Sequence, residues 1–213
     1  AVLTAILMYG VVPIWLLAGP ADWLCHRRQR IEASSGVKES LLHVLQFVEV
    51  GVPLLAALVL EIDATVLLLM LLGLVLHQAT VMWDISYADA TRRIPPAEQH
   101  VHAVLEMVPL FALLLVAVVH RDQLLVPDFA LRLKHPPLPG WYLAAVLAGA
   151  VICGVIPYGE ELLRCLRGAS SVADRQPRGP AVLYDSMSNF QHNDFTTTRR
   201  RGRPGPAPGA RAR

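Results

Sequence analysis

Five long apolar segments restrict the fold of this chain more than any other feature. They cover residues 1–19, 37–62, 64–88, 98–120 and 140–168. A helix rises ~1.5 Å per residue, so each segment is long enough to cross a hydrocarbon core of ~30 Å. The chain is 54% hydrophobic and 17% charged, whereas soluble domains carry ~25% charged residues. These features predict an all-α fold, a polytopic membrane bundle of five transmembrane helices.

Prolines predict where these helices begin and bend. Pro95 and Pro96 precede the fourth segment, where the first helical turn tolerates a missing N–H group. The first helix is expected to continue beyond its apolar part to Ser34. Kinks are expected at the interior prolines, which are Pro13, Pro53, Pro109 and Pro157.

The distribution of basic residues predicts the orientation of the bundle. Eight lie on one side, namely Arg27, Arg28, Arg30, Lys38, Arg92, Arg93, Arg164 and Arg167, and three on the other, namely Arg121, Arg132 and Lys134. Because basic residues favour the cytoplasmic side, the N-terminus is expected outside and the C-terminus in the cytoplasm. The first apolar segment is followed, not preceded, by basic residues, which indicates a retained transmembrane helix rather than a signal peptide.

The composition changes at about residue 169. Residues 169–213 are polar and rich in Pro, Gly and Arg, which predicts a disordered basic cytoplasmic tail after a bundle of residues 1–168. The stretch Arg-Gly-Arg-Pro at 201–204 is similar to the core of an AT-hook. On a membrane protein with one such copy, attraction to anionic lipid headgroups is favoured over nucleic-acid binding.

Carboxylates and imidazoles recur together on the first four segments, close to the predicted cytoplasmic face. The candidate site residues are Asp22 and His26, Glu39 and His43, His77 and Asp84, and Glu98, His102 and Glu106. Spacings of four and seven place each set on one helix face, whereas His100 points elsewhere. Since ionisable groups in membrane helices are costly, these stripes are expected to face the bundle interior.

Mixed carboxylate and imidazole ligands on four helices are also how soluble four-helix bundles hold two iron or manganese ions. Those bundles use a spacing of three, so the similarity is one of chemistry. The nine residues predict a dinuclear transition-metal site, with iron favoured and zinc or manganese as alternatives. One or two of the nine are expected to act instead as a general base or to support the ligands. Gln46 extends the stripe on the second helix, and Glu49 is a candidate hydrogen-bond partner.

Three other interpretations remain open from the sequence. The ionisable groups could form an interfacial belt that pairs with basic residues, namely Arg27, Arg28, Arg92 and Arg93. Two of the histidines could hold haem, which the companion carboxylates disfavour. The protein could be non-catalytic, as a metal or proton carrier or a structural subunit, although the apolar outer halves of the second and third helices disfavour a carrier. Cys25, Cys153 and Cys165 are scattered, which argues against thiolate metal sites.

A site at membrane level predicts a lipidic or quinone-like substrate. The favoured function is therefore a metal-dependent membrane enzyme, an oxidoreductase if the metal is iron and a hydrolase if it is zinc. No nucleophile elbow accompanies Ser40 or Thr80, so serine-type hydrolysis is not indicated.

Four stretches resemble a group of uncharacterised bacterial integral membrane proteins. They are DWLCHRRQRIE, KESLLH, MWDISYA and EQHVHAVLEMVP, and the similarity extends over all five helices. The resemblance implies a bacterial inner-membrane setting. Some members carry the label diguanylate cyclase, but this chain has no Gly-Gly-Asp/Glu-Glu-Phe signature and no soluble α/β domain, so that activity is not expected.

Overall fold

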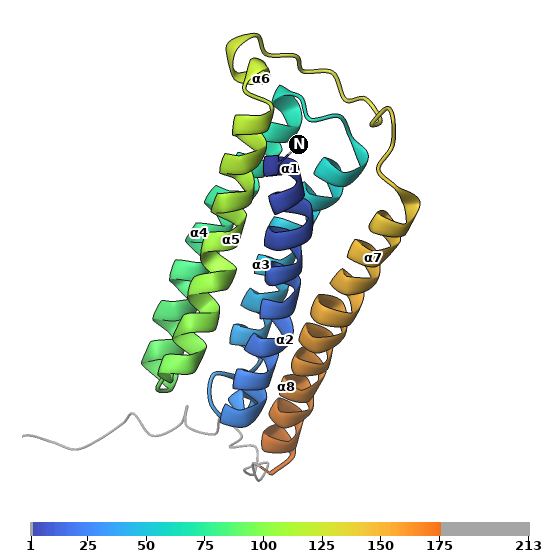
Figure 1. The fold of residues 1–213 in the computed structure, drawn as a ribbon. Coiled ribbons are helices and arrows are strands. Elements are labelled where there is room, and N and C mark those ends of the chain that lie inside the picture. The colour runs from blue at the N-terminus through green and yellow to red at the C-terminus, as the bar shows by residue number, and fades with distance from the viewer. Residues whose placement is uncertain (1, 176–213) are drawn as a thin grey trace, which may run out of the picture. The chain divides into compact units, whose positions relative to one another are not determined.

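The structure, a computed structural model, describes residues 2–175 and is a bundle of five long helices (Figure 1). The first is α1 (Val2–Ile6), a π-helical turn η1 (Leu7–Val11) and α2 (Val12–Gln29); the next three are α3 (Gly36–Val59), α4 (Ala64–Thr91) and α5 (Pro96–Val119). A short α6 (Asp122–Leu125) precedes the fifth, made of α7 (Gly140–Ala150), a π-helical turn η3 (Val151–Val155) and α8 (Ile156–Arg175). No strand is present among the described residues. The predicted all-α fold with five transmembrane helices is confirmed.

Two of the four prolines at which kinks are expected lie just after π-helical turns. Pro13 follows η1, and Pro157 follows η3. A proline ring displaces the carbonyl four residues earlier and removes one hydrogen bond. In both helices that carbonyl, of Tyr9 or Cys153, lies inside the wide turn, which absorbs the displacement. By contrast, α3 and α5 continue through their prolines.

The connection after α2 differs from the prediction. The helix ends at Gln29 rather than Ser34, because Arg30 adopts a left-handed conformation with φ 55°. A 3₁₀ turn, η2 (Ile31–Ala33), follows, and Gly36 is also left-handed with φ 63°. Glycine adopts this conformation without a steric penalty. The two left-handed residues reverse the chain into α3.

Close packing in the middle of the bundle depends on small residues. A Cβ atom at Gly19 would lie 2.5 Å from the carbonyl oxygen of Cys153, and one at Gly73 would lie 2.6 Å from that of Glu49. Large apolar side chains point outward instead; Leu72 and Phe111 are more than half exposed. This arrangement is typical of a membrane bundle, where small residues bring backbones together and apolar ones face lipid.

The two ends of the bundle are built differently. At one, here called the loop end, residues 126–139 cross over the α3–α4 connection (Figure 1). Backbone N–H groups of Glu61 and Lys134 donate to the carbonyls of Arg132 and Val59, each at 2.9 Å. At the other, the polar end, the C-terminal parts of α2, α4 and α8 meet the N-terminal parts of α3 and α5.

The predicted tail is only partly described. Helix α8 continues to Arg175, so the first residues after 168 are helical. Residues 176–213, including the stretch at 201–204, lie outside the described part of the chain.

Candidate metal centre

Ionisable side chains from all five membrane helices and the loop after α4 are packed together at the polar end. This polar cluster consists of Asp22, His26, Glu39, His43, Asp84, Arg92, Glu98, His102 and Glu161. Every member except Arg92 and His102 is buried. Of the nine residues predicted from the sequence, seven belong to the cluster. The stripes therefore converge, as their spacing predicted.

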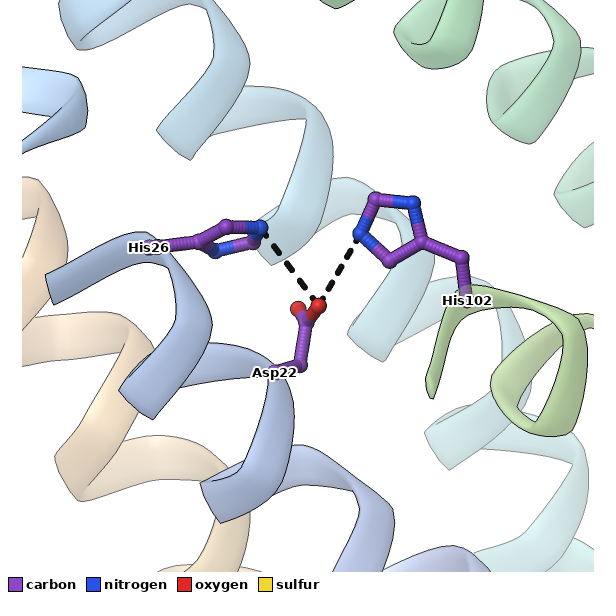
Figure 2. A group of neighbouring side chains, drawn as sticks. All are labelled: Asp22, His26 and His102. Atoms are coloured by element: carbon purple, nitrogen blue, oxygen red, sulfur yellow. Dashed lines mark ion pairs between the residues drawn. The ribbon is translucent and has the colours of Figure 1, made fainter. Parts of the chain in front are cut away.

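One carboxylate oxygen of Asp22 lies between two imidazoles (Figure 2). Asp22 Oδ1 is 3.0 Å from His102 Nε2 and 3.4 Å from His26 Nε2. Glu98 Oε1 is 3.4 Å from the same atom of His26 and 3.8 Å from that of His102. Helices α2 and α5 thus bring two nitrogen and two oxygen donors to a common point.

A second group of donors lies beside the first. His43 Nε2 is 3.2 Å from Asp84 Oδ2, and Gln46 donates a hydrogen bond of 3.0 Å to the same oxygen. The rings of His43 and His26 are stacked, with centroids 4.4 Å apart and planes inclined by 7°. The two groups are therefore adjacent.

Glu161 joins the two groups through both of its oxygens. Its Oε2 is 2.9 Å from His26 Nδ1, and its Oε1 is 2.8 Å from His43 Nδ1. When Nδ1 of a neutral imidazole donates to a carboxylate, Nε2 is left as an acceptor with a free lone pair. Glu161 thus orients both rings so that their Nε2 atoms face the other carboxylates.

Arg92 neutralises two of the cluster carboxylates. Its guanidinium donates to both oxygens of Glu39 and both oxygens of Glu98. Burial alone would lower the pKa of Arg92, but these hydrogen bonds raise it above its usual range. Glu39 is therefore paired with a basic residue, as the interfacial-belt interpretation expects. Glu98 is paired in the same way but also lies near His26. Arg27 pairs instead with Glu160, outside the cluster, at 3.2 Å.

A cavity of about 40 Å³ adjoins the cluster. Its wall includes Asp22, His43, His77, Asp84, His102 and Glu106. A buried water needs ~10–15 Å³, so the cavity has room for a few waters or ions. The two predicted residues that are not in the cluster, His77 and Glu106, thus face the same space as its histidines.

Four buried donor and acceptor atoms of the cluster have no hydrogen-bond partner among the described residues. They are Asp22 Oδ1, His26 Nε2, His43 Nε2 and Asp84 Oδ1. Buried polar atoms are nearly always paired, because desolvation without a partner is costly. Nitrogen and oxygen lone pairs that converge in this way repel one another unless a proton or a cation lies between them.

The other residues considered from the sequence lie away from this point. Glu49 accepts a hydrogen bond of 2.8 Å from Thr80 and faces a different cavity. His100 is exposed, as its place on the helix predicted. Cys25, Cys153 and Cys165 are free thiols.

Glu161 was not predicted. The predicted pattern pairs a carboxylate with an imidazole on one helix, and the fifth segment has no histidine. The available signal was the pair Glu160 and Glu161 at the end of an apolar segment, where acidic residues are costly and usually have a partner.

No family model, curated protein or solved structure matches this chain. The functional proposal below therefore rests on the geometry of the polar end.

Proposed function

We propose that the protein is a metal-dependent integral membrane enzyme with a dinuclear carboxylate–histidine site in the polar cluster. One observation supports this most directly: nitrogen and oxygen atoms approach to 3.0–3.4 Å at Asp22 without hydrogen bonding through Oδ1. Two ligand atoms ~2.1 Å from one ion stand ~3.0 Å apart at an angle of ~90° and ~3.4 Å apart at ~109°. The separations at Asp22 fit two ligands around a shared metal ion.

The donors divide into two metal positions. Asp22, His26 and His102 supply the first. The second takes His43 and Asp84, and His77 and Glu106 line the cavity beside it. Glu39 and Glu98 are not ligands in this proposal, because Arg92 engages both oxygens of each.

Imidazole and carboxylate donors suit iron, manganese and zinc, and iron is our first choice. A bound ion would polarise a substrate oxygen or lower the pKa of a bound water, for oxidation or hydroxylation with iron and hydrolysis with zinc. Glu106 is half-buried in the cavity wall and makes a candidate proton acceptor there. The substrate is lipidic or quinone-like, because the site lies at the level of the membrane helices.

We place the site on the cytoplasmic side of a bacterial inner membrane. The support is the excess of basic residues at the polar end and the resemblance of the helices to bacterial membrane proteins. A metal or proton carrier is less favoured, since the cavity beyond Trp15 has a mainly apolar wall.

Metal stoichiometry tests the proposal. Purified protein should contain ~two ions per chain, and Asp84→Ala should lower that to ~one, because Asp84 serves only the second position. Asp89→Ala changes an exposed residue of the same helix and should leave the content unchanged. Folded wild-type protein without metal, or equal losses from the two variants, would contradict the proposal.

A further inference from the structure

A second, larger cavity of about 170 Å³ lies between the first membrane helix, α3 and α5. Its wall is mainly apolar and includes Met8, Val12, Leu54 and Ala112. We call it the apolar cavity. It occupies the half of the bundle nearer the loop end, away from the polar cluster.

The two ends of the apolar cavity differ in charge. Lys134 and His120 line it at the loop end. Lys134 Nζ donates one hydrogen bond of 2.8 Å to the carbonyl of Ala57, and an ammonium has three donors, so two remain. Glu49 lies in the wall at the other end. An anionic group is therefore attracted to the loop end and repelled from the deep end.

The deep end of the apolar cavity adjoins the metal centre. Trp15 and Val50 line both this cavity and the one beside the polar cluster. Thr4 and Trp15 mark its extent along the first helix; eleven residues at ~1.5 Å each give ~16 Å. One leaflet of a hydrocarbon core of ~30 Å has a thickness of ~15 Å. The cavity wall therefore extends along the first helix over about the thickness of one leaflet.

We propose that the apolar cavity binds a single-chain anionic lipid, a long-chain fatty acid, with its carboxylate at Lys134 and its distal carbons against Trp15. The binding follows from the shape and charge of the cavity. That the bound chain is also the enzyme's substrate rests on the proposed function, which would present the distal carbons to the metal centre.

Fluorescence quenching of Trp15 by brominated stearic acids tests this binding. The chain has four tryptophans, so the parent protein is the full chain with Trp23→Phe, Trp83→Phe and Trp141→Phe. Stearate brominated near its methyl end should quench Trp15 saturably, and stearate brominated near its carboxylate should quench much less. The methyl ester should bind ~10-fold or more weakly, because a charge-assisted hydrogen bond is lost.

Two lysines provide matched variants. Lys134→Ala should weaken binding ~10-fold, whereas Lys38→Ala, at the polar end beside Trp83 and Tyr87, should leave it unchanged. If Lys134→Ala does not fold, Ala112→Phe fills the cavity and should abolish saturable quenching. Equal affinities for acid and ester, equal quenching from both bromine positions, or saturable quenching by a quinone with none by the brominated acids would overturn the proposal.

The same titration after chelation separates this inference from the proposed function. Binding should be unchanged when metal is removed, because no cluster residue touches the carboxylate end. Protein that is purified without any metal, before chelation, and still binds stearate would contradict the proposed function alone. Metal-loaded protein that does not bind it would contradict this inference alone.

Discussion

The two cavities share Trp15 and Val50, yet they are stabilised in opposite ways. The cavity at the polar end is surrounded by buried groups that need partners, such as Glu161 between two histidines. Around the apolar cavity the helices are stabilised by close packing, and Gly73 allows α4 to approach α3. Removing one partner should therefore be severe at the polar end, whereas adding volume should be the damaging change in the other half.

The largest effect is expected from Glu161→Ala. It leaves two buried imidazole N–H groups without their acceptor, and loss of one partner of a buried pair costs ~3–5 kcal/mol. Denaturant unfolding in detergent micelles measures the free energy. Glu160→Ala is the matched control, because Glu160 is 36% exposed and its ion pairs with Arg27 and Arg164 and its hydrogen bond from Trp23 each contribute ~1 kcal/mol or less. Similar losses of stability in the two variants would show that Glu161 does not connect His26 and His43.

Arg92→Ala should destabilise the polar end by ~3 kcal/mol. The change leaves the buried carboxylates of Glu39 and Glu98 without their shared guanidinium partner. Arg92→Lys should recover only part of the loss, since an ammonium cannot donate in the forked geometry. Arg93→Ala, at an exposed position, is the control in the same unfolding measurement. Full recovery of stability in Arg92→Lys would argue against the forked pairing.

In the apolar half, Gly73→Ala should cost ~1–3 kcal/mol by overpacking. The added Cβ would lie 2.6 Å from both the Glu49 carbonyl oxygen and Pro53 Cγ. Gly51→Ala meets nothing within 4 Å and should be neutral or slightly stabilising, because alanine favours helix. Thermal unfolding of the two variants measures the difference in stability. If Gly73→Ala were as stable as wild type, α3 and α4 would have to separate easily.

The smallest expected effect concerns His120 at the loop end. Burial first, and then the neighbouring Lys134, lower the pKa of His120 from its ordinary value of 6.5. The folded state therefore binds this proton less readily than the unfolded state. Wild type should lose stability relative to His120→Gln as pH falls below 6.5. Parallel stability curves between pH 7 and pH 5 would contradict the assignment.

The fold was predictable because apolar length and helical spacing are local properties. They define the five segments and place the pairs such as Glu39 and His43 on single faces. The partners across helices were not predictable in this way. Arg92 follows α4, yet it joins α3 and α5, and Glu161 acts on two histidines more than 100 residues away. The apolar cavity was also missed, since a gap between helices leaves no mark on periodicity.

Elemental analysis of wild type, His102→Ala and His100→Ala tests the central claim most directly. Both substitutions remove an imidazole from the first turns of α5, but only His102 approaches Asp22, at 3.0 Å, whereas His100 is exposed. We predict a transition metal in the wild type, a clear loss in His102→Ala and none in His100→Ala. Folded wild-type protein without metal, or equal losses from the two variants, would contradict a metal centre and leave a proton-shared ion-pair network at the polar end.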